Sequence, residues 1–130
     1  MAVTNFFTDT ITVTYSGNGK TVTGKVGSYT GTKDAGVAIV IPAGAVNQAV
    51  PITFPFANIQ ACVMDASQSL TVKTNSTTTP GNTINLIGTK AQDWAIDYVA
   101  TKPYSADVTI MYVTNATATD SIFNVRVLYI

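Results

Sequence analysis

Hydrophobic and polar residues alternate with a period of two along most of the chain. Between residues 9 and 15, Ile11, Val13 and Tyr15 alternate with threonines. The alternation returns after the Ser-Gly-Asn-Gly sequence at 16–19, which favours a tight turn because Asn and Gly tolerate positive φ angles. A period of two is typical of β-strands with one buried and one exposed face. The pattern therefore predicts an antiparallel hairpin near the N-terminus.

Further hydrophobic segments follow at short intervals, separated by polar or Gly- and Pro-containing segments. They predict strands at 37–41, 59–64, 70–74, 83–87, 94–98, 108–113 and 122–130, with loops at 30–36, 75–82 and 115–120. Residues 50–56 also alternate, but Pro51 and Pro55 lack the amide hydrogen that a ladder needs. We expect that segment at a sheet edge or as an extended connection. About ten short strands with regular turn signals predict an all-β, single-domain antiparallel β-sandwich.

Two parts of the chain are apolar on both faces. The run at 37–41 (VAIVI) is apolar throughout, which predicts a strand covered on both sides. In the last two strands, Met111 and Val113 alternate with other apolar residues, and Leu128 and Ile130 do the same. Such strands are either buried at the centre of a sheet or part of a subunit interface. We therefore select Met111, Val113, Leu128 and Ile130 as possible interface residues.

The composition strengthens this picture. Of 130 residues, 48 are β-branched (22 Thr, 15 Val and 11 Ile), whereas the chain has three Leu and no Glu, so long helices are not expected. Charged residues make up 11% of the chain and the net charge is zero. Free monomers usually keep more surface charge for solubility. The composition favours a protein that hides much of its surface against partners.

Several kinds of chemistry are excluded by the residue types. Without His, the chain has no Ser-His-Asp or Cys-His nucleophile pair and no imidazole metal ligand. A single Arg and zero net charge give no electrostatic footprint for nucleic acid. Cys62 lies in an apolar run and is interpreted as a small buried hydrophobe. We predict that the protein is not an enzyme and has no catalytic residue, metal site or cofactor.

Neither a membrane span nor a secretory signal is expected. The N-terminal residues lack a basic segment followed by an uninterrupted apolar one, which a signal peptide requires. No apolar run approaches the roughly 20 residues of a membrane-spanning helix.

Asp93 and Asp97 are the closest pair of carboxylates in the sequence. On a strand they would share one face about 13 Å apart, which is wider than the separation in either class of glycosidase. We interpret them as solvated acids. A calcium site that combines one of them with loop carbonyls stays open, although the chain lacks a spaced acidic loop.

Trp94, Tyr98 and Tyr104 offer flat aromatic faces of the kind that bind sugars. Trp94 alternates with Ile96 and Tyr98, which favours the core or an interface instead. The triplets that begin at Asn75 and Asn115 match the glycosylation sequon, as expected by chance in a Thr-rich chain. The sequence at 17–21 (GNGKT) is similar to the end of a phosphate-binding loop, but no helix follows it, and we interpret it as part of the hairpin.

The order of these segments resembles the small decoration, or cement, proteins of tailed-bacteriophage capsids. The resemblance is carried by the segments at 11–19, 69–75, 85–94, 107–116 and 125–128. It implies a jelly-roll-like sandwich that associates on the capsid surface, often as a trimer, with no catalytic motif. On this basis we expect a virion structural protein that is made in the host cytoplasm. Its expected partners are the major capsid protein and other copies of itself, with a trimer favoured.

Residues 1–8 are expected to form an N-terminal arm, and residues 9–130 the sandwich domain. Phe6 and Phe7 would need burial at a chain end, so we hypothesise that the arm extends to a neighbouring subunit, and we add both to the possible interface residues. The alternative function is a receptor- or carbohydrate-binding module, such as a phage fibre head, which would use Trp94, Tyr98, Tyr104 or the loop at 75–82. An exposed Trp94 would favour this alternative, and a buried one the structural role.

Overall fold

The computed structural model describes residues 5–10, 15–17, 20–22, 26–31, 33–96 and 101–130, with side chains from residue 33 onwards. Within these ranges every regular element is a β-strand, and every paired strand is antiparallel to its neighbour. Two four-stranded sheets enclose one main hydrophobic core. The predicted all-β antiparallel sandwich is therefore confirmed.

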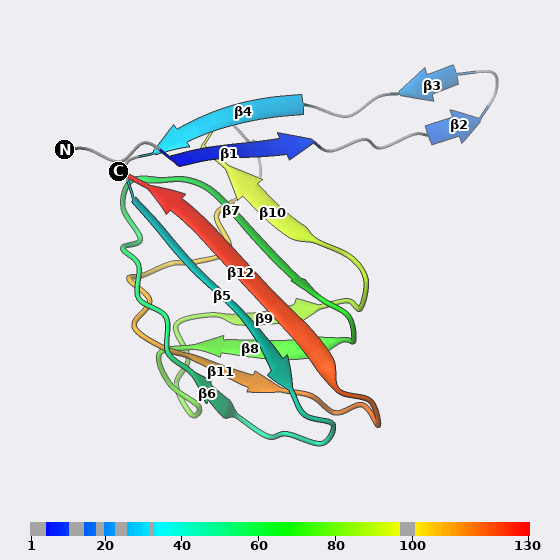
Figure 1. The fold of residues 1–130 in the computed structure, drawn as a ribbon, viewed down its shortest axis with the longest axis vertical. Helices are drawn as coiled ribbons and strands as arrows, with labels where there is room; N and C mark the ends of the chain where they lie inside the picture. The colour runs from blue at the N-terminus through cyan, green and yellow to red at the C-terminus, as the bar shows by residue number, and fades with distance from the viewer. Residues whose placement is uncertain (1–4, 11–14, 18–19, 23–25, 32, 97–100) are drawn as a thin grey trace.

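The first sheet contains the longest strands. Its order is β10 (Gln92–Ala95), β7 (Ile59–Ala66), β12 (Ser121–Tyr129) and β5 (Lys33–Ile41). β12 lies inside the sheet and pairs along its length with β5 and β7. Figure 1 shows these strands running diagonally across the molecule.

The second sheet has the order β6 (Gln48–Val50), β11 (Met111–Thr114), β8 (Leu70–Thr74) and β9 (Thr83–Leu86). In Figure 1 its strands cross those of the first sheet. Between β5 and β12 the chain passes from one sheet to the other at almost every connection. Among these eight described strands, only β8 and β9 are both consecutive and paired. Most pairing therefore joins segments that are distant in the sequence.

A two-stranded ribbon precedes the sandwich. β1 (Asn5–Thr10) pairs with β4 (Val26–Gly31), and β2 (Tyr15–Gly17) pairs with β3 (Lys20–Val22). The pairing of Gly17 with Lys20 confirms the predicted hairpin. β4 contacts β7 and β12, whereas β2 and β3 lie farther out, away from both sheets (Figure 1).

The core follows from the alternation along the strands. Side chains that point inward from the two sheets are buried, among them Phe123, Val125, Met64, Met111, Val113, Val72 and Leu86. Phe54 and Tyr104 close one end of the core with an edge-to-face contact, their ring centroids 4.9 Å apart. Burial of this kind stabilises a sandwich by roughly 25 cal/mol per Å² of apolar surface removed from water.

Of the two alternatives expected for residues 50–56, the structure shows an extended connection that follows an edge strand. β6 is the outer strand of its sheet, and it ends at Val50, directly before Pro51. Farther along, Phe54 exchanges two backbone hydrogen bonds with Val108, each with a donor–acceptor distance of 3.0 Å. Pro51 and Pro55 lie outside the strands, so neither removes a hydrogen bond from a sheet, and the segment tolerates both.

The predicted loop at 30–36 is wrong. The structure instead places Val26–Gly31 in β4 and Lys33–Ile41 in β5. Each residue of β12 from Ser121 to Tyr129 has a partner in β5, so tertiary pairing overrides the weak strand propensity of Gly, Lys and Asp. Gly36 also makes room for its partner, because a Cβ there would lie 2.8 Å from Cδ of Arg126.

Two further expectations about strands are wrong. The apolar run at 37–41 is covered on one face only: Ile41 is buried, whereas Val40 on the outer face is 53% exposed. β10 ends at Ala95, so Ile96 is exposed and does not share the buried face of Trp94. Tyr98, the third residue expected on that face, lies outside the described residues.

Candidate interaction surface

The two outer faces of the sandwich differ in chemistry. We call the outer face of β10-β7-β12-β5 the mixed face, because buried apolar, charged and exposed apolar residues follow one another along it. We call the outer face of β6-β11-β8-β9 the threonine face. Since directly paired residues of antiparallel strands share a face, the strand register assigns each residue to one of them.

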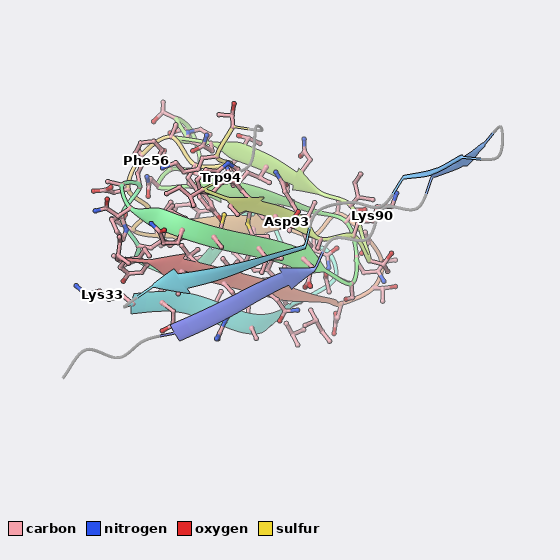
Figure 2. All side chains as sticks on the ribbon, turned by 90° about the horizontal axis from the view of Figure 1, so that it is seen from above. Lys33, Phe56, Lys90, Asp93 and Trp94 are labelled. Atoms are coloured by element: carbon pink, nitrogen blue, oxygen red, sulfur yellow. The ribbon has the colours of Figure 1, made fainter. Side chains whose placement is uncertain are left out.

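One end of the mixed face is buried. Ala95, Ala61 and Leu128 are directly paired across three strands and form a second, smaller apolar cluster. Asp34 continues the row at the beginning of β5, three residues after the end of β4. The β1–β4 pair passes in front of this sheet in Figure 2, and β4 contacts β7 and β12. The small alanine side chains allow this close approach of the ribbon.

The middle of the mixed face carries the chain's single arginine. Arg126 is paired directly with Gly36, and its side chain lies over that glycine. Its guanidinium Nη2 lies 3.6 Å from Oδ2 of Asp34. Both side chains are exposed, so solvent and salt screen the pair and its contribution to stability is small. The Arg126 side chain thereby extends over β5, from Gly36 toward Asp34.

The opposite end of the mixed face is open. A groove of about 390 Å³ lies there, lined by Asp65, Ala66, Ser67, Thr89, Ala91, Ile122 and Asn124. Oδ1 of Asp65 accepts a hydrogen bond of 2.7 Å from Nδ2 of Asn124. Ile122 is 54% exposed and is directly paired with the exposed Val40. Two β-branched hydrocarbon side chains therefore lie side by side in solvent, next to a groove whose lining has one charged residue.

The threonine face has its polar groups bonded to one another. Thr71 donates to Asn85 (Oγ1 to Oδ1, 3.3 Å), and Nζ of Lys73 donates to the carbonyl of Thr77 at 3.1 Å. Thr114 Oγ1 accepts from the amide of Asn47 at 3.0 Å. A hollow of about 270 Å³ on this side is lined by Ser69, Leu70, Thr71, Asn85, Leu86, Thr114, Ala116 and Thr117. This face presents satisfied polar groups to water.

The predicted interface residues occupy three kinds of position. Met111 and Val113 point into the main core and are fully buried, so the folded chain presents no surface at either side chain. Leu128 is buried in the small cluster on the mixed face. Ile130 is exposed at the end of β12. An interface that uses described side chains must therefore be built largely from other residues.

Phe6 and Phe7 lie in β1, where they pair with Thr30 and Tyr29 of the same chain. Part of the expected arm at 1–8 is thus a strand within the N-terminal ribbon. The division into an arm at 1–8 and a domain at 9–130 stays a prediction.

The aromatic side chains expected at a sugar platform are buried where they are described. Trp94 is 7% exposed, and Tyr104 is fully buried. Nζ of Lys102 lies 5.4 Å from the Trp94 ring centroid and 4.1 Å from that of Phe56, and donates to the Phe56 carbonyl at 3.0 Å. These cation–π contacts fasten the connection after β10 to the sandwich. Trp94 and Phe56 lie close together in Figure 2.

Tyr104 carries a hydroxyl that has no hydrogen-bond partner among the described residues. Burial raises the pKa of Tyr104 well above its usual value of 10.0, and the nearby Cys62 raises it further. Cys62 is itself buried, which confirms its interpretation as a small core residue. The neutral hydroxyl is therefore strongly favoured in the folded protein.

The other predicted sites are dispersed. Asp93 is half-buried on β10, and Asp97 lies outside the described residues. Within the described ranges, no three Cys or Asp side chains form a group that could hold a metal ion. No helix in that part of the chain is long and apolar enough to cross a membrane.

Both sequon asparagines have structural roles. Nδ2 of Asn115 donates to the carbonyls of Ile41 (3.1 Å) and Thr119 (2.9 Å), and Oδ1 accepts from Thr117. Asn115 is fully buried, so its amide is closed to glycosylation in the folded chain. Asn75 has a φ of 68°, and its side chain donates to the Asp107 carbonyl and accepts from Thr109. These bonds explain why Asn occupies both loop positions.

Comparisons with family models, with curated proteins and with solved structures found no match for this chain. The sequence analysis missed the groove and the exposed Ile122–Val40 pair. Alternation alone indicates that Ile122 and Phe123 point to opposite faces, but the pairing of Ile122 with Val40 depends on the register between two strands that are far apart in the sequence.

Proposed function

We propose that this protein is a virion structural protein that decorates and cements a capsid. In this proposal it is made in the host cytoplasm and assembles on the capsid surface, where it contacts the major capsid protein and further copies of itself, with a trimer as the favoured state. We also propose that the sandwich is a jelly roll. The observation that carries both proposals is the strand order.

The order β5-β12-β7-β10 faces the order β6-β11-β8-β9. Two interleaved Greek keys of eight strands, with the chain crossing between sheets at nearly every connection, have this arrangement. Jelly rolls of this kind build viral capsid domains and also lectins. The strand order thus supports the structural role and leaves carbohydrate binding as its competitor.

The burial of Trp94 and Tyr104 favours the structural role over carbohydrate binding. A sugar platform needs an exposed aromatic face, whereas Trp94 and Tyr104 are both buried in the sandwich. The mixed face, with exposed hydrocarbon beside a groove, is a better contact surface for protein. Each contact can be weak, because an array of many copies multiplies weak contacts into firm attachment.

The proposal is tested by mixing the purified chain with shells assembled from the major capsid protein that is encoded in the same genome. We expect the chain to co-sediment with the shells at a fixed stoichiometry and to raise the temperature at which they disrupt. A glycan array serves as the competing arm. Absence from the shells together with specific glycan binding would overturn the proposal in favour of the carbohydrate-binding module.

A further inference from the structure

We propose that β5 of one copy pairs antiparallel with β5 of a second copy, so that the first sheets of two sandwiches join edge to edge about a twofold axis. This inference goes beyond the proposed function, because the contact forms between two copies with or without a capsid. It is also independent of the contacts that would hold a trimer together, since a twofold pair can join single copies or whole trimers.

The open edge of β5 is the first part of the argument. The Ile122 amide donates to Ser67, and the Ile122 carbonyl accepts from the Ser67 amide, so Ile122 turns its backbone groups toward β7. Successive residues of a strand point these groups to opposite sides, so the odd-numbered residues of β12 bond with their odd-numbered partners in β5. The even-numbered residues of β5 therefore turn their N–H and C=O groups away from the sheet. Those of Gly36, Ala38 and Val40 form no hydrogen bond with the described residues.

β5 differs from the other edge strands in its length and its side chains. It has nine residues, whereas β6, β9 and β10 have three or four. Soluble proteins usually protect a long edge with a lysine, a proline or a bulge. From Ala35 to Ile41, β5 has none of these, its register with β12 is continuous, and every residue is Gly, Ala, Val or Ile. This part of β5 is therefore open to pairing with another strand.

A second copy of β5 satisfies this edge along its whole length. In the full antiparallel overlap, Val37 lies opposite Val37 of the second copy, and Gly36 lies opposite Ala38. Each facing pair of even-numbered residues then exchanges two hydrogen bonds, as in any antiparallel ladder. Val37 and Ile39 are half-buried at the rim of the core, and the same overlap covers them with apolar counterparts. Burial of this hydrocarbon adds to the hydrogen bonds in favouring association.

Charge complementarity selects a second copy and this register. Lys33 begins β5, so the overlap brings it opposite Ile41 of the other copy, where Ile41 pairs with Ser121. The residue before Ser121 is Asp120, which is exposed and accepts a hydrogen bond of 2.9 Å from the Ala43 amide. Neither Lys33 nor Asp120 forms an ion pair with the described residues. The twofold axis brings a lysine of one copy toward an aspartate of the other at both ends of the contact, which favours this register over shifted ones.

The other charges of this part of the molecule do not oppose the contact. Asp34 follows Lys33, but it points to the mixed face, where it forms the ion pair with Arg126. Asp65 lies on β7 and is separated from the edge by β12. Lys90 lies between β9 and β10, the edge strands on the opposite side of the sandwich, and Figure 2 shows Lys33 and Lys90 far apart.

The contact is small. A strand of this length spans about 30 Å and one sheet is about 10 Å thick, so the pair buries less area than a standard protein interface. We therefore expect a concentration-dependent pair with a dissociation constant of roughly 10–100 µM. On a capsid, an array of copies would multiply such contacts.

The first experiment measures hydrogen exchange of single backbone amides in the full chain, between about 10 µM and about 1 mM protein. We expect the amides of Gly36, Ala38 and Val40 to exchange at least about fivefold more slowly at the highest concentration, because a paired edge exchanges only through the separated copies. The amides of Val37 and Ile39 are the internal control, since they bond with β12 in every copy. Unchanged exchange at the three edge amides, or equal slowing at all five, overturns the inference.

The second experiment blocks the edge. Ala38→Pro removes an amide hydrogen that points away from the sheet, and proline is compatible with such a position on an edge strand. Asn85→Pro is the matched control: the Thr74 amide donates to the Asn82 carbonyl, so the Asn85 amide faces the open edge of β9 in the same way. In sedimentation equilibrium at the highest concentration, we expect Ala38→Pro to have about half the mass of the wild type and Asn85→Pro to have the same mass. Equal masses of Ala38→Pro and the wild type overturn the pairing.

The third experiment tests the choice of occupant with a double-mutant cycle. Lys33→Gln removes the positive charge, and Asp120→Asn removes the negative charge but keeps the Oδ1 that accepts from Ala43. Each should weaken association by about two- to fivefold at low salt, and the double variant by no more than either single one, because both remove the same contact. Asp107→Asn is the control, since the exposed Asp107 accepts from the Phe56 amide in the same manner. Additive losses, or an equal loss from Asp107→Asn, overturn the pairing of Lys33 with Asp120.

The outcomes separate this inference from the proposed function. A chain that stays unpaired but co-sediments with shells would reject the β5 contact and leave the capsid role standing. A chain that pairs but does not bind shells would reject the capsid role alone. Protection of the three edge amides that occurs only when shells are added would identify a strand of the capsid protein as the occupant and overturn the pairing of two copies.

Discussion

On the threonine face, the hydroxyl and amide groups bond to one another and to nearby carbonyls, as Thr71 does with Asn85. On the mixed face, the same sandwich presents a buried leucine, an arginine held over a glycine and two exposed aliphatic side chains. Both faces cover one core and share the low charge of the chain. Their difference shows that a hydrogen-bonded surface and a surface with exposed hydrocarbon can be built from the same alternating pattern.

The two faces differ because the ribbon covers part of the mixed face, whereas the threonine face is open to solvent. The ribbon covers one end of the mixed face, and an apolar residue there, Leu128, is as well buried as the core. Outer positions of the threonine face are exposed or half-buried, and Thr71, Asn85 and Thr114 there form hydrogen bonds with neighbouring residues. Four substitutions test the comparison, beginning with the largest expected effect.

Leu128→Ala should lower the free energy of unfolding by about 2–5 kcal/mol, because it leaves a cavity beneath the ribbon. Thr71→Ala on the threonine face is the control and should cost less than about 0.5 kcal/mol, as most surface substitutions do. Urea unfolding of both variants measures the difference. Similar small values for the two would mean that the ribbon does not protect Leu128.

Gly36→Val should cost about 1–3 kcal/mol, the usual scale of overpacking, because its Cβ would lie 2.8 Å from Cδ of Arg126 and 3.1 Å from a backbone carbonyl oxygen. The matched control is Ala49→Val on β6, an edge strand of the other sheet, where Ala49 is exposed. We expect little change there in a thermal melt. A destabilisation of equal size at both positions would contradict the close approach of Arg126 to Gly36.

Alkaline pH should lower the stability of the core that lies between the two faces, because it favours ionisation of Tyr104 in the unfolded chain. The folded-state pKa of Tyr104 is raised, so the protein keeps this hydroxyl protonated where the unfolded chain ionises it. Stability should be unaffected by this group below pH about 10 and should then fall by about 1.4 kcal/mol per pH unit. Tyr104→Phe should remove that slope and cost little at neutral pH, because the hydroxyl has no described hydrogen-bond partner. Urea unfolding from pH 7 to 11 checks both outcomes.

Arg126→Gln should have the smallest effect, below about 1 kcal/mol, because the ion pair with Asp34 is exposed. Raising the salt concentration should reduce the difference from wild type further. A salt-independent loss above that size would indicate that packing of the Arg126 side chain over Gly36, rather than its charge, stabilises this part of the mixed face.

Much of the fold could be predicted because local patterns and tertiary pairing agree. The strand at 70–74, the N-terminal hairpin and the loop at 75–82 all follow from alternation and turn residues. The predictions of secondary structure are wrong where pairing with a strand distant in the sequence determines the conformation. Residues 33–36 are strand because β12 pairs with them, although their own sequence (KDAG) favours a loop.

The candidate surface was harder to predict than the fold. Met111 and Val113 were selected because apolar residues occur on both sides of their strand, but alternation cannot distinguish a core from an interface. Ile122 and Val40 became neighbours only through the register of β12 with β5. A surface patch formed by two strands that are far apart in the sequence gives no continuous pattern that sequence analysis could detect.

The position of β12 has a consequence for synthesis. β12 lies between β5 and β7 in the finished sheet, yet residues 121–129 leave the ribosome after every other described strand. Until then β5 and β7 have no common partner, and their open edges are exposed to pairing with other chains. Formation of the sheet must wait for that last strand, and such distant pairing folds slowly. Expression at lower temperature or with chaperones should therefore raise the yield of soluble protein.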